Sequence, residues 1–323
     1  MQRMTFADAI IDGLCHALRS DDSVSLIGSA LLGLGPHRRK VDRIKQQFPG
    51  RLLDGPTSEA ALAGLGAGAA MAGGRPFVDL GTASFALLAM PQIVNEAAVA
   101  HSMSGGQITA PVVYHMLHGV RGGGGAQHST SPQALFWNSP GLQIVLPASP
   151  RDAKGLIRHA FKTNSPTVIL NHAKLMPIEE DVPTGDFDIP FGQADIKRAG
   201  RDITIVATSH LVQLALEAAR TLSGSGIEVE VLDLRTLCPL DEDALLASVS
   251  RTGRLLVVDE CPLRCGPASE IAATVAERAW SSLKQAPQRL TRADAPIPCS
   301  AVLEAALTPD AEKIVQRVMQ MMR

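Results

Sequence analysis

Residues 54–80 read DGPTSEAALAGLGAGAAMAGGRPFVDL, and this stretch decides the fold that the sequence predicts. Thr57 or Ser58 can cap a helix whose first turn holds Glu59, where the helix dipole favours a carboxylate. The helix is followed by RPFVDL at 75–80, a short and continuously apolar run. Such continuous apolarity is typical of a strand that is buried on both faces of a parallel sheet.

The same succession of a short apolar run and a helical stretch recurs along the whole chain. The segment 176–201 interrupts it with several prolines, glycines and acidic residues, so we place a domain boundary near residue 190. The sequence therefore predicts two doubly wound α/β domains, residues 1–190 and 191–323. The predicted strands are 24–28, 51–54, 75–80, 110–117, 142–147, 166–171, 202–209, 228–236 and 254–260, and the predicted helices include 6–18, 210–223, 241–250, 268–284 and one from residue 309.

Composition excludes several classes of protein. The 323 residues are about two domains' worth, 46% are hydrophobic, and 30 Lys and Arg against 32 Asp and Glu leave a net charge of −2. A disordered chain and a nucleic-acid partner are therefore disfavoured. No apolar run has the length of a membrane span, and the acidic, polar N-terminus does not resemble a targeting peptide. We expect a cytoplasmic protein without membrane contact, and its five scattered cysteines to be reduced thiols.

One face of the predicted helix carries almost no side chains. Ala60, Gly64, Gly68 and Ala72 recur every four residues, so another helix can approach this face closely, as at a subunit contact. The residues 64–69 also match a permissive dinucleotide fingerprint. We reject that match because its glycines lie inside the helix and not at a strand-to-helix turn.

A second candidate segment is GVRGGGGAQHSTSP at 119–132, which follows the predicted strand 110–117. It lacks the Lys-Ser/Thr that closes a nucleotide-binding P-loop. Two interpretations stay open from these residues alone: a surface loop with a solvated His128, or a loop at the carboxyl end of a parallel strand that delivers His128 to a reacting centre. Hydrolase and metalloenzyme chemistry is disfavoured because the sequence has no G-x-S-x-G elbow and no metal-ligand pairing of histidines.

Ordered motifs over nearly the whole chain resemble the beta subunit of the thiamine-diphosphate-dependent decarboxylase of 2-oxo acid dehydrogenase complexes. The resemblance implies a transketolase-like pyrimidine-binding domain followed by a transketolase C-terminal domain. The motifs are DGPTSE (54–59), QIVNEAA (92–98), SGG (104–106), GGGGAQHS (122–129), PGL (140–142), SPRDAKGL (149–156), DLRTLCPLD (233–241), VDE (258–260) and DAPIP (294–298).

This resemblance implies that the chain binds thiamine diphosphate. Glu59 matches the carboxylate that activates the aminopyrimidine by driving it to its imino tautomer. Thr57, Gly81 and Phe85 match neighbours of the pyrimidine ring, and His128 matches a histidine that faces the substrate or the acyl acceptor. In this family an alpha subunit supplies a Gly-Asp-Gly…Asn-Asn segment for the Mg²⁺-diphosphate end. No Gly-Asp-Gly occurs in these residues, so an alpha2-beta2 heterotetramer is implied.

Beta subunits of the family also hold a monovalent cation such as K⁺ through backbone carbonyls. The matching residues are Val112, Ala160, Thr163 and Ser165, although threonine and serine replace the usual aspartate and asparagine at the last two.

Other departures lie around the cofactor. His115 stands in place of an arginine and Asn171 in place of an acidic residue. Gly28-Ser29-Ala30 replaces Gly-Glu-Asp, and positions 57, 81 and 130 also differ.

Three functional hypotheses follow from these residues. The first is the beta subunit of an enzyme that decarboxylates a 2-oxo acid and passes the acyl group on, with a lipoyl acyltransferase as a further partner. The second is an acyloin-type carbon–carbon ligase of a biosynthetic pathway, which the departures motivate. The third is a non-catalytic structural subunit, and the retained Glu59, Phe85 and His128 count against it.

Overall fold

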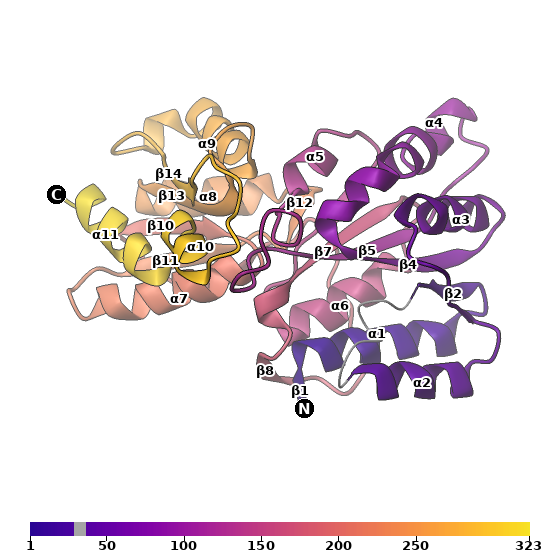
Figure 1. Ribbon diagram of the computed structural model, residues 1–323. Coiled ribbons are helices and arrows are strands. Elements are labelled where there is room, and N and C mark those ends of the chain that lie inside the picture. Colours follow the sequence, from indigo (N-terminus) through magenta and orange to yellow (C-terminus); the bar gives the residue numbers. More distant parts are fainter. Residues whose placement is uncertain (29–36) are drawn as a thin grey trace. The chain divides into compact units, whose positions relative to one another are not determined.

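The computed structural model describes residues 1–28 and 37–323 and divides into two compact units (Figure 1). The first unit comprises Met1–His118 and Leu135–Phe191, and the second comprises Gly119–Ala134 and Gly192–Arg323. The glycine-rich loop, residues 119–134, thus belongs with the second unit although it follows a strand of the first. Ser29 and Ala30, two of the departures noted above, lie outside the described residues.

The first unit is built on a parallel sheet, as the continuous apolar runs predict. Its strands lie in the order β6-β7-β5-β4-β2-β3. Each neighbouring pair is parallel. The strands are β2 (Val24–Ile27), β3 (Leu52–Leu53), β4 (Arg75–Thr82), β5 (Val113–His118), β6 (Gln143–Val145) and β7 (Thr167–His172).

Helices cover both faces of this sheet (Figure 1). Phe77 of β4 belongs to the core that α1 and α6 cover. The next residue, Val78, faces α3 so closely that a Cβ on Gly66 would lie 2.3 Å from its Cγ2. The elements are α1 (Phe6–Ser20), α2 (Arg38–Gln47), α6 (Pro150–Ala160), α3 (Glu59–Met71), the 3₁₀ helix η2 (Ala83–Ala89), the π-helix η3 (Pro91–Ala97), α4 (Ala100–Met103), α5 (Gln133–Trp137) and η4 (Ala173–Leu175), with β1 (Gln2–Thr5) antiparallel to β8 (Glu179–Val182).

The second unit holds a five-stranded sheet in the order β14-β13-β10-β11-β9. Its strands are parallel except β9 (Asp195–Arg198), which is antiparallel to β11. The expectation of a purely parallel sheet is therefore wrong at this edge, which the segment 176–201 supplies. The other elements are β10 (Ile203–Ala207), β11 (Val229–Asp233), β12 (Thr236–Cys238), β13 (Leu255–Pro262), β14 (Gln288–Arg292), α7 (His210–Ser223), α8 (Glu242–Thr252), α9 (Pro267–Arg278), η5 (Trp280–Ser282), α10 (Ala301–Leu307) and α11 (Ala311–Met321).

In the part of the chain that the structure describes, no single helix has the length and apolarity to cross a membrane. The helices 83–89 and 91–103, which meet at a bend of 55°, together reach the length and apolarity of a membrane span, by length and composition alone. Ala83, Ala86, Ala89 and Ile93 of this pair are fully buried in the protein.

Candidate functional site

A cavity of about 220 Å³ opens at the carboxyl ends of β2 and β4, beside the N-terminus of α3. The carboxyl edge of a parallel sheet is the usual place for a ligand in α/β proteins. The cavity is lined by Gly28, Asp54, Gly55, Pro56, Thr57, Glu59, Leu62, Asp79 and Leu80. It is the candidate site of the first unit.

Glu59 is the first residue of α3, and its side chain is half-buried in the wall of this cavity. Ser58 occupies the N-cap with extended backbone, but its hydroxyl accepts no hydrogen bond from the helix. The expected capping bond is therefore not made. The carboxylate of Glu59 stays at the positive end of the helix, where its charge is stabilised.

Only two of the four residues that were predicted to lie beside the cofactor line the cavity. Thr57 and Glu59 line the cavity, whereas Gly81 and Phe85 do not. Gly81 adopts a left-handed φ of 70°, which favours glycine, and its N–H donates to Asp79 Oδ1 at 3.0 Å. Phe85 lies half-buried on η2, which packs against α3.

Asp79 is a cavity residue that the sequence analysis missed. It lies within the apolar part of β4 and is 1% exposed. Gly28 approaches its backbone so closely that a Cβ there would lie 2.7 Å from the Asp79 carbonyl oxygen. A single carboxylate within the apolar run RPFVDL was the signal that could have identified it, because a buried charge needs partners.

The partners of Asp79 form a buried row across three strands. His115 Nδ1 lies 3.3 Å from Asp79 Oδ1, and Asn171 Nδ2 lies 2.9 Å from His115 Nε2. Because the amide donates to Nε2, the ring proton belongs on Nδ1, where it is donated to Asp79. The Phe77 ring stacks on His115 with centroids 5.2 Å apart. His115 and Asn171, two departures from the family pattern, thus belong to one contact network.

Among the described residues, two buried oxygens of this row have no hydrogen-bond partner, Asp79 Oδ2 and Asn171 Oδ1. The Glu59 carboxylate in the cavity wall supplies the acceptor that an aminopyrimidine requires. The residues present therefore fit that end of thiamine diphosphate.

His128 belongs to the second unit, so neither unit by itself brings it together with Glu59. Its side chain is exposed, and its backbone N–H donates to Gly125 O at 3.2 Å within the glycine-rich loop.

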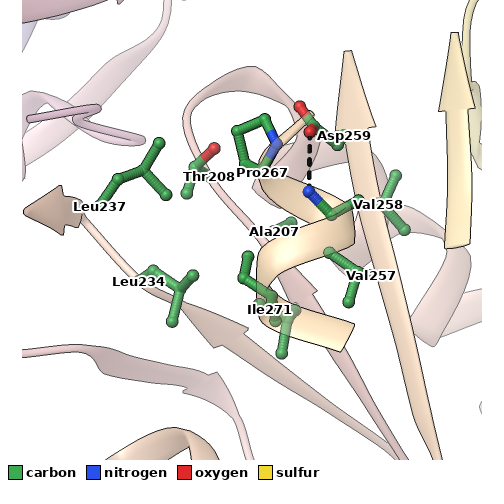
Figure 2. A pocket seen from close by; sticks show the side chains of 11 residues that line it. Ala207, Thr208, Leu234, Leu237, Val257, Val258, Asp259, Pro267 and Ile271 are labelled. Carbon is green, nitrogen blue, oxygen red and sulfur yellow. Dashed lines mark hydrogen bonds between the residues drawn. The ribbon is translucent and has the colours of Figure 1, made fainter. Parts of the chain in front are cut away.

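The second unit also contains a cavity, of only about 10 Å³ (Figure 2). Its walls are mostly apolar, with Leu234, Val257 and Ile271 among them. A space of this size holds one water at most, so we assign no ligand to it.

The backbone carbonyls expected to hold a monovalent cation already accept hydrogen bonds from the protein. Val112 O accepts from Thr167 N at 2.9 Å. The Thr163 hydroxyl lies 3.3 Å from both Ala160 O and Ser165 O, to which it donates. The fourth carbonyl, that of Thr163, has a charged donor.

Arg75 is the charged donor to the Thr163 carbonyl. Its Nη1 donates to Thr163 O at 2.6 Å and to Phe161 O at 3.0 Å, and its Nη2 donates to Asn164 Oδ1 at 2.8 Å. The guanidinium thus places positive charge at Thr163 O, one of the four expected carbonyls, and disfavours a cation beside it. Among the described residues no cluster of His, Cys, Asp and Glu could hold another metal ion.

Comparison with known proteins places the chain in a family. Residues 2–179 match the transketolase pyrimidine binding domain, and residues 192–314 match the transketolase C-terminal domain. The structure resembles a split-gene transketolase, described as an inactive beta4 tetramer, with a TM-score of 0.81, 23% identity and coverage of 99% of this chain and 98% of that one. The fold is therefore that of a two-domain transketolase-like protein.

Relatives in sequence show which family of transketolase-like proteins the chain belongs to. The chain is 37% identical to the acetoin:2,6-dichlorophenolindophenol oxidoreductase subunit beta of Cupriavidus necator, over 100% of this chain and 98% of that protein. It is also 37% identical to the mitochondrial pyruvate dehydrogenase E1 component subunit beta-1 of Arabidopsis thaliana, over 98% and 88%. The chain belongs to this family of beta subunits of 2-oxo acid dehydrogenases. These matches do not favour the carbon–carbon ligase or the non-catalytic subunit.

Proposed function

We propose that this chain is the beta subunit of a heteromeric thiamine-diphosphate enzyme that decarboxylates a 2-oxo acid and transfers the acyl group to a lipoyl-bearing partner. The observation that carries the proposal is the Glu59 carboxylate in the wall of a cavity at the carboxyl edge of the parallel sheet. The relatives support it, since both are named as beta subunits of oxidoreductases.

Thiamine diphosphate, when bound, supplies the nucleophilic carbon for attack on the oxo group. Glu59 shares a proton with a ring nitrogen of the aminopyrimidine and so favours its imino form. Leu62 and Leu80 give the cavity apolar walls that exclude water.

His128 acts later, as an acid or base toward the substrate or the acyl acceptor. An alpha subunit completes the enzyme as an alpha2-beta2 heterotetramer, because the sequence lacks the Gly-Asp-Gly segment for the Mg²⁺-diphosphate group. The family's K⁺ is not part of the proposal, since Arg75 donates to Thr163 O, one of the four carbonyls expected to hold it.

The experiment compares Glu59→Gln with His128→Ala in the complex reconstituted with its alpha subunit. We expect Glu59→Gln to lower turnover by about 100-fold or more and to slow hydrogen–deuterium exchange at the thiazolium carbon in parallel. Assembly and affinity for thiamine diphosphate should be retained because the amide preserves the side-chain volume. His128→Ala should leave the exchange intact and slow a later step.

Dye reduction with 2,6-dichlorophenolindophenol, measured with pyruvate and with acetoin, distinguishes the two kinds of substrate named for the relatives. Unslowed exchange in Glu59→Gln would show that Glu59 is only a helix-terminus carboxylate.

A further inference from the structure

Two buried carboxylates of the second unit anchor the glycine-rich loop, and the first anchor closes its base. Glu260 of β13 is 4% exposed. Its Oε1 accepts hydrogen bonds from Val120 N and from Ser131 Oγ, each at 2.9 Å. These two residues lie at opposite ends of the loop, so one oxygen fixes both. Gly119 N also donates to Thr130 O at 3.1 Å across the same base.

The second anchor holds the glycine run itself. Glu304 of α10 is 3% exposed, and its two oxygens accept from consecutive amides, Gly122 N at 2.7 Å and Gly123 N at 2.9 Å. The two glycines have φ of 84° and 109°, in the left-handed region that side chains disfavour. A Cβ on Gly123 would also lie 2.9 Å from Cys299 O. Glycine is therefore required where the loop meets this carboxylate.

His128 lies between the two anchors on a stretch with mainly local backbone bonds. Thr130 Oγ1 donates to Ala126 O at 2.9 Å, and His128 N donates to Gly125 O. Ala126, Gln127 and His128 are exposed. A glycine-rich segment has many accessible conformations, and hydrogen bonds at its ends restrict them. Bonds to a charged acceptor are the stronger kind.

We infer that Glu304 and Glu260 are positioning residues, which hold the glycine-rich loop so that His128 is presented in one conformation. The inference rests on the proposed role of His128, and it predicts that the carboxylates act on turnover only through that residue.

The test uses Glu304→Gln in the reconstituted complex. Glutamine keeps the volume but has one acceptor for two amides, and its NH₂ group faces an N–H donor. Backbone hydrogen exchange over 119–131 should rise about tenfold, as expected for the loss of one hydrogen bond. Turnover should fall about tenfold with little change in KM. Glu312→Gln, on the exposed face of α11, is the matched control and should change neither quantity.

A double-mutant cycle separates positioning from stability. In a His128→Ala background, Glu304→Gln should cause no further loss of turnover, whereas a general weakening of the fold would lower turnover equally in both backgrounds. Equal losses, or unchanged exchange in the loop, would overturn the inference. If His128→Ala alone leaves turnover intact, the proposed function fails at that residue, and the exchange data still decide whether the carboxylates hold the loop. If Glu304→Gln fails to fold, the same cycle is measured with Glu260→Gln.

Discussion

Asp79 shows how one buried polar side chain organises the carboxyl end of a strand. It holds the turn at Gly81 through Oδ1 and contacts His115 with the same oxygen. A buried carboxylate is costly unless it is hydrogen-bonded. The row from Asp79 to Asn171 satisfies this oxygen, whereas Oδ2 has no partner among the described residues.

At the same scale, Arg75 predicts that the protein is independent of K⁺. Because the guanidinium donates to Thr163 O and Phe161 O, replacing K⁺ by choline should leave the thermal midpoint and the turnover unchanged. Arg75→Met removes the positive charge and should lower the stability by about 1–3 kcal/mol. Part of that loss should return when K⁺ is added, as differential scanning calorimetry in the two salts would show. A midpoint of the unmodified protein that rises with K⁺ would contradict this prediction.

Asp259 predicts a pH dependence of stability. Burial, with a smaller contribution from the charge of Glu260, raises the pKa of its carboxyl from 3.8 to about 6, although hydrogen bonds from Cys261 N and Ala268 N act in the opposite direction. Figure 2 shows the bond to Ala268 N, at 3.2 Å. The folded state thus binds a proton more tightly than the unfolded state. Stability should fall as pH rises from about 4 to about 6, by up to about 3 kcal/mol.

Urea unfolding across this pH range tests the prediction. Asp259→Asn cannot ionise, so its stability should change less between pH 4 and 6 than that of the unmodified chain. Asp243→Asn, an exposed carboxylate of α8, is the control and should keep the full dependence. Identical slopes for all three proteins would exclude Asp259 as the source.

Helix α3 has two glycine positions with opposite expected effects. A Cβ on Gly66 would lie 2.3 Å from Val78 Cγ2, whereas one on Gly68 meets nothing within 4 Å in the described part of the chain. Gly66→Ala should therefore destabilise the chain by about 1–3 kcal/mol through overpacking. Gly68→Ala should stabilise it by about 0.5–1 kcal/mol because alanine is the better helix former. Denaturant midpoints of the two variants decide this, and equal shifts would refute the assigned packing of α3.

The elements that the sequence predicts well are those with a strong local signal. Continuous apolar runs located β4, β5 and β7, and helical spacing located α7 at its observed bounds, His210–Ser223. The strands β8 and β9 and the helix α10 were missed. β8 pairs antiparallel with β1 in a separate two-stranded sheet, and β9 lies antiparallel at the edge of the sheet of the second unit. Both strands have few apolar residues, and α10 has only seven residues with Val302 and Leu303 exposed.

The site was predictable in part for a similar reason. Glu59 follows a recognisable helix start, so its position in the cavity could be anticipated. The contact of His115 with Asp79 depends on strand register, in which these two residues are paired across β4 and β5. Asn171 reaches His115 diagonally from β7, where Leu117 is its register partner. The local sequence does not predict which residues are paired across strands. It likewise does not predict the hydrogen bonds that Arg75 donates to carbonyl groups 86 and 88 residues away.

At the scale of the whole molecule, the first unit exposes large apolar side chains on α3, η2 and α4. Leu65 of α3 is 52% exposed, Leu88 of η2 is 62% exposed and Met103 of α4 is 80% exposed. A surface of this kind is typical of a contact with another chain. A contact with another chain also agrees with the absence of a Gly-Asp-Gly segment from the sequence, because the partner would supply the segment that binds the diphosphate group.

We therefore expect the chain to be inactive alone in the presence of thiamine diphosphate and Mg²⁺, and active once an alpha subunit is added. Gly64→Leu tests whether the small-residue face makes the contact. Among the described residues, a Cβ at this position would have only Gln92 Cγ nearby, at an ordinary 3.4 Å. Loss of assembly with an unchanged unfolding midpoint would thus locate the clash at the partner, at a cost of about 1–3 kcal/mol. Sedimentation velocity with parallel turnover assays measures both, and an active lone monomer would refute the heteromeric assembly.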